Sequence, residues 1–509
     1  MHGRDQSDPP VLAEKSANNA GQPAAESMER RGGTKGKAIS SSTRRAQDRD
    51  SVSPGLERLR QFVKANRNVR LTALLHHVSV GLLRWSYFAL KRHAAAGVDG
   101  RTWDAYGEGL EENLADLHER VHRGAYRALP SRRRMIPKPD GRERPLGIAS
   151  IEDKILQRAM VEILNSIYEQ EFLGFSYGFR PGRSQHDALD ALWVGISNTS
   201  VNWVVDTDIR SFFDTVNHDW MNRFIEQRIA DRRVLRLIRK WLKVGILEGT
   251  ILTASESGTP QGSVISPLMA NVYLHFVFDL WAQQWRRQHV HGNMIVVRYA
   301  DDLVTGFEHE ADARAFLMNM RARFEAFGLE LHPKKTRLIE FGRNARKNRK
   351  DRGLGKPETF TFLGFTHICG QSRRGRFLLW RKSRRDRMRA KLQAIKIDLH
   401  RKMHETLSAQ GRWLRSVVTG YFNYHAVPTN SSALSAFRYH VVRLWWRTLR
   451  RRSQVDCTTL EAMLRLAQRW LPLPRILHPW PNQRFAVKHP RWEPSARIAP
   501  AGICAGGAR

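Results

Sequence analysis

The chain has 509 residues, too many for one compact core, and its 85 Lys and Arg against 49 Asp and Glu leave a net charge of +36. A positive charge of this size predicts polyanionic partners rather than any particular fold. The 3 cysteines form no Cys-x-x-Cys pair, which excludes a disulfide scaffold and a paired-cysteine zinc module and favours the reducing cytoplasm.

Residues 1–53 are mostly Gly, Ser, Ala and charged residues, with almost no large apolar side chains. Such a segment cannot bury enough apolar surface to offset the entropy of ordering it, so it is predicted to be a disordered tail. It lacks the apolar core of a signal peptide, and no stretch of the chain approaches the roughly 18–20 apolar residues of a membrane span. We therefore expect a soluble, cytoplasmic protein with no membrane partner.

Apolar residues at helical spacing begin near Pro54, and from about residue 125 to 370 short β-rich runs alternate with helices. The Val- and Ile-rich runs WVVDTDI and MIVVRYADDLVTGF predict strands. A mixture of helices and strands that does not alternate regularly predicts an α+β domain. The predicted helices cover residues 218–247, 266–285 and 311–331, the last with Gly328 as its stop signal.

The chain past this domain begins with an irregular, basic break over residues 343–357. A short strand pair, FTFLGFTH and RFLLW, follows the break. From Ser383 the pattern is helical again, with apolar stripes opposite dense Arg and Lys, and from Pro472 it is Pro-rich and irregular.

Three carboxylates are the candidate catalytic groups. Asp208 ends one predicted strand, and Asp301 and Asp302 stand at the tip of the predicted YADD hairpin. Neighbouring strand ends would bring the three together, where their charges repel and divalent cations such as Mg²⁺ relieve the cost. Two such ions, roughly 3.5–4 Å apart, would activate a 3′-hydroxyl and stabilise a leaving pyrophosphate. The alternative is that Asp-Asp is only a turn, because Asp tolerates a left-handed backbone.

Eight blocks in order decide between these readings. They make the chain, from about Ala96 to Gln454, resemble the reverse transcriptases encoded by group II introns. The blocks are AGVDG, RMIPKPDGRERPLGIASIEDKILQRAM, FSYGFRPGRSQHDAL, VVDTDIRSFFDTVNHDW, GTPQGSVISPLMANVYL, VVRYADDLV, GLELHPKKTRLIEFG and FTFLGF.

The resemblance implies a right-hand polymerase. Residues 54–195 would form an N-terminal extension and fingers, and residues 196–370 a palm with an antiparallel sheet. Residues 371–471 would form a helical thumb, also called the X or maturase domain. Residues 472–509 would be a short basic tail. No Cys- and His-rich HNH endonuclease fits there, as in endonuclease-lacking intron lineages, whose primer comes from elsewhere.

Roles for single residues also come from the resemblance. Asp208, Asp301 and Asp302 would be the catalytic, metal-binding triad for two Mg²⁺ ions, assisted by the Ile209 carbonyl. Lys138 and Arg144 would hold the incoming triphosphate, as their charge suits; the alternative is a solvated surface charge. Phe213 would exclude a ribose 2′-hydroxyl, unless it is core packing beside Phe212. Gln261 would contact the nucleotide near the primer end, unless its Pro-Gln-Gly is an ordinary turn.

The basic helices and interleaved aromatics past the palm favour binding of structured RNA; the alternative is a solvated basic face over an aromatic core. The candidate RNA-binding residues are Arg180, Arg183, Tyr421 and Tyr424, while Trp445 and Trp446 are expected in the core.

The predicted function is RNA-directed DNA synthesis by a group II intron protein that also assists splicing and mobility. Its implied partners are intron RNA, an RNA template with a DNA primer, dNTPs and target DNA, and a homodimer is left open. One alternative is the reverse transcriptase of a retron, a diversity-generating element or a CRISPR system. A second alternative is an RNA-binding splicing factor with a dormant palm. The three intact carboxylates argue against it.

Overall fold

The computed structural model describes residues 42–137, 143–248, 251–253, 258, 262–452 and 459–488. The chain divides into two units, residues 1–46 and 47–509, and the described residues from Gln47 onward belong to the second. Within the described ranges, no helix has both the length and the apolar character that crossing a bilayer requires.

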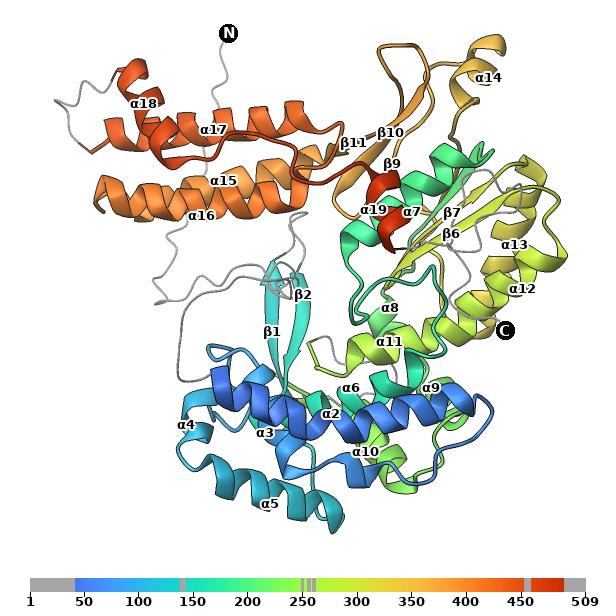
Figure 1. Ribbon diagram of the computed structural model, residues 1–509, viewed down its shortest axis with the longest axis vertical. Coiled ribbons are helices and arrows are strands. Elements are labelled where there is room, and N and C mark those ends of the chain that lie inside the picture. Colours follow the sequence, from blue (N-terminus) through green and yellow to red (C-terminus); the bar gives the residue numbers. More distant parts are fainter. Residues whose placement is uncertain are drawn as a thin grey trace, which may run out of the picture. The chain divides into compact units, whose positions relative to one another are not determined.

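Figure 1 shows the helices and strands along the chain. The helices are α2 (Ser42–Ala65), η1 (Leu75–His77), α3 (Val80–Ala89), α4 (Trp103–Gly107), α5 (Leu110–His122), α6 (Ile151–Tyr168), α7 (Gln185–Asn198), α8 (Phe212–Thr215), α9 (His218–Glu226), α10 (Arg232–Lys243), α11 (Ser266–Leu274), η2 (His275–Asp279), α12 (Leu280–Gln288), α13 (Glu310–Ala326), α14 (Ala345–Asp351), α15 (Arg385–Arg401), α16 (Leu407–His425), α17 (Ser431–Arg450), α18 (Leu460–Trp470) and α19 (Pro481–Lys488). The strands are β1 (Ser131–Pro137), β2 (Glu143–Ile148), β3 (Trp203–Thr207), β4 (Ile246–Glu248), β5 (Ile251–Thr253), β6 (Met294–Tyr299), β7 (Asp302–Phe307), β8 (Arg337–Glu340), β9 (Phe360–Phe362), β10 (Phe365–Gln371) and β11 (Phe377–Ser383).

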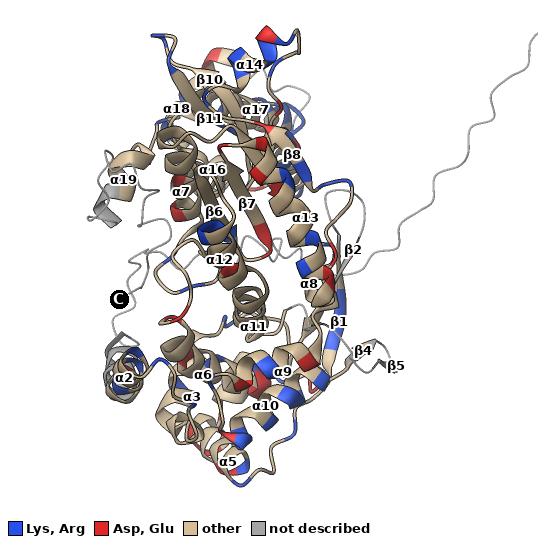
Figure 2. Cartoon of the chain, turned by 90° about the vertical axis from the view of Figure 1, so that its right-hand side faces the viewer, with Lys and Arg blue, Asp and Glu red and all other residues tan. Residues whose placement is uncertain are grey.

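The central sheet carries the candidate carboxylates. Its strands run antiparallel in the order β6-β7-β3-β8. In Figure 2, α7 and α13 flank β6 and β7, and contacts join α7 to β6 and α13 to β3 and β7. Helices on both faces explain why β6 and β7 are almost continuous apolar runs, buried along nearly their whole length. The predicted strands of this region, and the mixed α+β class, are confirmed.

Helix boundaries differ from the prediction in two places. Residues 218–247 form two helices, α9 and α10, followed by β4, and not one helix. Asp231 causes the break because its carboxylate accepts hydrogen bonds from the amides of Leu74 and Leu75, at 2.8 and 3.0 Å, and caps α10 through the amide of Arg233. The predicted irregular segment 343–357 contains α14, a short and strongly basic helix.

Other predicted helices are confirmed. Residues 266–285 lie in a continuous run of α11, the π-helical turn η2 and α12. Helix α13 ends at Ala326, and Gly328 follows with a φ of +74°. Helix α2 begins at Ser42, so residues 42–53 are helical where the composition predicts a disordered tail over residues 1–53; the rest of that predicted tail lies outside the described residues.

Two further sheets lie outside the central one. Strands β1 and β2 form a hairpin that continues through β4 to β5, and β4 runs parallel to β1. Where the sequence predicts a pair of strands near residue 370, the structure shows a three-stranded sheet of β9, β10 and β11. The predicted strand FTFLGFTH turns at Leu363 and Gly364, so it forms two strands instead of one.

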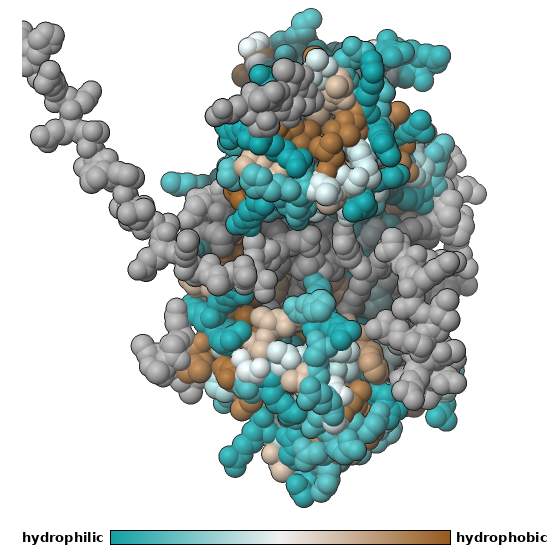
Figure 3. Space-filling view, turned by 90° about the vertical axis from the view of Figure 1, so that its left-hand side faces the viewer, coloured by the Kyte–Doolittle hydropathy of each residue, from teal (hydrophilic) through white to brown (hydrophobic). Residues whose placement is uncertain are grey.

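A helical bundle of α15 to α18 has its own core. The indole of Trp445 is fully buried and donates to the side-chain oxygen of Gln410 at 2.8 Å, while Trp446 is partly buried against the same core. Exposed apolar side chains interrupt the hydrophilic surface, visible as brown patches in the upper half of Figure 3. They include Leu407, Leu460 and Leu464.

The chain returns from the bundle to the central domain over residues 471–488. His478 contacts the Asn423 carbonyl at 2.8 Å, and α19 packs against α7. Buried Asp190 of α7 pairs with Arg381 of β11, at 3.1 Å, and with Arg484 of α19. One carboxylate thus ties three separate parts of the chain together.

We expect stability to fall in mild acid, partly through His367. Burial, reinforced by the charge of Arg381, lowers the pKa of His367 to about 3. The unfolded histidine takes up a proton near pH 6.5 while the folded one stays neutral, so its contribution is complete above pH 6.5 and is lost as the pH falls toward about 3. In His367→Phe, whose ring can keep the stacking on Phe360, the free energy of unfolding should change less between pH 7 and pH 5. Urea titrations at both values measure it, and an undiminished pH dependence would contradict the assignment.

Candidate active site

The sheet brings the three predicted carboxylates to one edge. Asp208 directly follows β3, Asp301 lies in the β6–β7 turn, and Asp302 begins β7. Thr207 pairs with Leu303, so the same register places Asp208 opposite Asp302. Figure 2 shows the acidic start of β7 in red.

Their electrostatics show an excess of negative charge. The pKa of Asp302 is raised to about 7 because the surrounding protein removes hydration and because Asp301 and Asp208 are negative. Part of Asp302 remains exposed to solvent, which leaves the group open to an incoming ligand. Asp206 lies two positions before Asp208; burial raises its pKa to about 6, against the opposing ion pair with Arg337.

Asp208 is held from the segment before β8. Its carbonyl accepts from the amide of His332 at 2.8 Å, and its own amide donates to the hydroxyl of Thr336 at 3.3 Å. The ammonium of Lys335 lies 3.1 Å from its carboxylate, with both side chains partly exposed. A cation therefore already neutralises one of the three carboxylates.

The donor set suits a hard divalent cation, because carboxylate oxygens are the ligands that Mg²⁺ prefers. In the part of the chain that the structure describes, no three His, Cys, Asp or Glu side chains are arranged to hold a metal ion. The three aspartates influence one another's charge, and the carbonyl of buried Ile209 lies beside them in sequence.

Beneath the turn lies a fully buried arginine. Arg298 of β6 forms a two-pronged ion pair with Asp279, at 2.7 and 2.6 Å, and donates to the Asn271 side chain at 2.9 Å. It also donates to the carbonyl of Ala300 in the turn at 3.2 Å. Burial alone would raise the pKa of Asp279, but Arg298 and His275 hold it below its ordinary value.

The same network holds a loop against the turn. Ser176 forms a parallel bridge with Arg298, and Asn271 donates to the carbonyl of Gly178 at 2.7 Å. A Cβ atom on Gly178 would lie 2.3 Å from the Ala300 amide nitrogen, so only glycine permits this approach. Ala300 itself has a φ of +56°. The turn's unusual backbone is thus braced by its neighbours.

Phe213 lies in α8, five positions after Asp208. Phe212 is buried against the core, whereas Phe213 is half-buried and meets Phe212 edge-on at 5.3 Å. The neighbouring ring takes the core position, which leaves Phe213 partly open beside the strand end.

Three predicted nucleotide contacts stay predictions. Lys138 and Gln261 lie outside the described residues. Arg144 pairs with Ile136 in the β1–β2 ladder, but its side chain lies outside the described atoms.

The four candidate RNA contacts touch protein in this structure. Arg180 is buried against Glu169 and nearby carbonyls, and Arg183 donates to the Ser176 carbonyl at 3.2 Å. Tyr421 is buried and stacks on Phe437, and the Tyr424 hydroxyl donates to the Leu363 carbonyl at 2.7 Å. Their contact with RNA stays a prediction.

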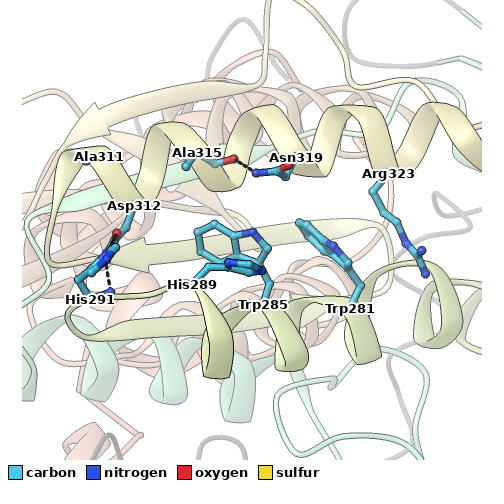
Figure 4. Close-up of a pocket in the computed structure, with 9 residues that line it drawn as sticks. All are labelled: Trp281, Trp285, His289, His291, Ala311, Asp312, Ala315, Asn319 and Arg323. Atoms are coloured by element: carbon cyan, nitrogen blue, oxygen red, sulfur yellow. Dashed lines mark hydrogen bonds and ion pairs between the residues drawn. The ribbon is translucent and has the colours of Figure 1, made fainter.

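A pocket of about 620 Å³ lies between α12 and α13 (Figure 4). Trp281 and Trp285 face Ala315 and Arg323 across it, and none of its lining residues belongs to the carboxylate cluster. The cluster, and not this pocket, is the candidate active site.

Comparison with known proteins identifies the domain around the cluster. Residues 136–367 match the family described as reverse transcriptase (RNA-dependent DNA polymerase). The chain contains a reverse transcriptase domain. This segment includes β3 and the β6–β7 hairpin, and so all three aspartates.

The reverse transcriptase is related to group II intron-encoded proteins. Group II intron-encoded protein LtrA of Lactococcus lactis subsp. cremoris is 38% identical over 189 residues, 37% of this chain and 31% of the relative. Protein YkfC of Escherichia coli K12 is 39% identical over 182 residues, 35% of this chain and 48% of the relative. An uncharacterized 91 kDa protein in the cob intron of Schizosaccharomyces pombe is 26% identical over 386 residues, 62% of this chain and 45% of the relative. The chain thus spans less than half the length of each of these relatives.

Sequence reasoning missed several residues of this candidate site. Asp206 had a signal, since residues two apart on a strand share a face. For Lys335 and for the Arg298–Asp279 pair the sequence holds no signal of comparable strength, because the residues that they contact lie far away along the chain.

We expect Arg298 to position the turn that carries Asp301 and Asp302. Arg298→Gln and Arg381→Gln each remove a buried ion pair, at a cost of about 3–5 kcal/mol, but only Arg298 contacts the turn. At a temperature where circular dichroism shows both variants folded, Arg298→Gln should lower primer-extension turnover about a hundredfold, since a small misplacement of reacting groups is that costly. Arg381→Gln should keep a primer-extension turnover close to that of the unaltered chain. Equal losses in both variants would reduce the role of Arg298 to stability.

Proposed function

We propose that this chain is an RNA-directed DNA polymerase that extends a DNA primer on an RNA template. One observation carries the proposal. The reverse transcriptase domain presents Asp208, Asp301 and Asp302 at one sheet edge, where burial and then the negative charges of Asp301 and Asp208 raise the pKa of Asp302 to about 7. Such a cluster is stable in its ionised form only with cations beside it.

The chain's own residues prepare the site for this chemistry. Asp208, Asp301 and Asp302 would hold two Mg²⁺ ions, which when bound activate a 3′-hydroxyl and stabilise the departing pyrophosphate. The Lys335 ammonium, 3.1 Å from Asp208, marks where positive charge is accommodated. The Arg298 network keeps the aspartates' backbone in place before substrate arrives, so orientation costs little at the moment of reaction.

Selection of deoxynucleotides is assigned to Phe213. Its half-buried ring, supported by buried Phe212, would clash with a ribose 2′-hydroxyl. Lys138, Arg144 and Gln261 keep their proposed roles at the triphosphate and the primer end through their places in the sequence motifs.

The right-hand architecture follows from the same proposal. The hairpin β1–β2, in residues 54–195, would belong to the fingers, and the central sheet, in residues 196–370, to the palm. The bundle of α15 to α18 would be the thumb, or maturase domain, within residues 371–471. Its basic surface suits contact with RNA phosphates, which makes a strongly salt-dependent affinity the expected behaviour.

We further propose that the RNA partner is a group II intron whose splicing and mobility the chain assists. The support is the relationship to a group II intron-encoded protein, together with the net charge of +36. Intron RNA, an RNA template with its primer, dNTPs and target DNA are then the partners.

We expect Asp301→Asn to lose primer extension to below about 1% of the unaltered chain, because a metal-binding oxygen is removed. Its unfolding midpoint should stay the same or rise, since the change removes a negative neighbour of Asp302. Extension of a primed RNA in the presence of Mg²⁺ measures the activity, and thermal unfolding measures the midpoint. Asp351→Asn, at an exposed carboxylate in α14, serves as the control and should be fully active. An inactive unaltered chain would refute the enzymatic proposal.

The intron proposal predicts which RNA accompanies the protein. Expressed with its native flanking DNA, the chain should co-purify with one structured RNA whose ends flank the coding region. Sequencing of the bound RNA identifies it. Recovery of a short unrelated noncoding RNA, or of bulk cellular RNA, would contradict the splicing role while leaving the polymerase in place.

A further inference from the structure

Phe179 has an unfavourable backbone and an exposed ring. Its φ is +59°, in the left-handed region that bulky residues rarely adopt, and its exposed fraction is 43%. Phe175 and Tyr177, just before it in the loop, are buried. The ring therefore contributes little to the core, and the conformation that presents it costs free energy.

The loop fixes Phe179 beside the catalytic turn. Gly178 lies against Ala300, and Asn271 anchors the Gly178 carbonyl at 2.7 Å to the Arg298 network. The Phe179 ring centre is 6.3 Å from that of Tyr299, the residue directly before the turn. Loop and turn are thus braced by the same buried groups, so the two rings and the aspartates keep a constant spacing.

Neighbouring side chains do not compete for the place of the ring. Arg180 turns inward to Glu169 and backbone carbonyls, and Arg183 turns to the carbonyls of Gly174 and Ser176. At this edge the loop therefore presents an aromatic face rather than a charge. Aromatic rings contact bases and sugars of any sequence, because every base has a π-face.

We propose that Phe179 and Tyr299 form a contact surface for the last base pair of the template–primer duplex. The inference rests on the proposed polymerase function, which requires the primer's 3′ end to reach the aspartates one and two residues beyond the Tyr299–Ala300 bond. A nucleic-acid end placed there meets the Phe179 ring. The ligand class is the bases and sugars of a duplex terminus, and the contact is independent of sequence.

Phe179→Gly separates this role from a structural one. Glycine adopts a positive φ without strain, so the unfolding midpoint should be unchanged or higher. The dissociation constant for an RNA–DNA template–primer, measured without dNTPs, should nevertheless rise on the order of tenfold, the scale of losing one base–aromatic contact. Phe179→Tyr, which keeps the ring, should bind as the unaltered chain does.

Phe62→Ala is the matched control, because Phe62 is a comparably exposed phenylalanine, at 48%, on helix α2. It should leave duplex affinity unchanged. Duplex affinity of Phe179→Gly equal to that of the unaltered chain, or an equal loss in Phe62→Ala, would overturn the inference. Primer extension by the unaltered chain reports separately on the proposed function, and the binding comparison still decides on Phe179 if extension is absent.

Discussion

The buried ion pair between Arg298 and Asp279 is the interaction on which the active-site edge depends. Two charges without solvent contact are tolerated only when each is paired and hydrogen-bonded. Here the guanidinium meets both oxygens of Asp279, the Asn271 side chain and the Ala300 carbonyl. Those partners belong to the helical run from α11 to α12 and to the β6–β7 turn, and Asn271 continues to the loop at Gly178. Satisfying one buried charge therefore specifies the relative position of a strand, a helix, a turn and a loop.

The aspartates above this pair follow the opposite electrostatic rule. Asp279 is neutralised in the fold and its pKa is held low, whereas Asp302 has a pKa raised to about 7 by its surroundings and by Asp301 and Asp208. Lys335, from a partly exposed position, forms an ion pair with Asp208 of this triad. The chain thus completes its charge balance where the structure must be rigid and leaves a deficit of positive charge where a ligand is expected to enter. A deficit of this kind costs stability, which is the usual trade-off at functional sites.

A second buried carboxylate, Asp190, connects the helical bundle with the reverse transcriptase domain. It forms ion pairs with Arg381, which precedes the bundle in the chain, and with Arg484, which follows it. The segments that enter and leave the bundle are therefore both tied to helix α7. Helix α7 also packs on β6, the strand that carries Arg298. The proposed thumb is therefore attached close to the proposed palm's central strands. This attachment gives a physical basis for combining the proposed polymerase role with the proposed RNA-binding role in one chain.

Local signals in the sequence were enough to predict the mixed α+β class, the strands β3, β6 and β7, and the position of the three aspartates at strand ends. These signals are apolar runs of strand length and the order of the motifs. It did not predict the division into α9 and α10, since Asp231 acts as a cap through contacts to Leu74 and Leu75, far back in the chain. The roles of Lys335 and Arg298 were equally hidden among 85 basic residues, and that of Asp279 among 49 acidic ones. Which arginines are buried, which aromatic rings face solvent and the position of Phe179 beside Tyr299 became visible only in the folded chain. The reason is that burial and pairing depend on residues brought together from distant positions, whereas strand and turn preferences depend on neighbours.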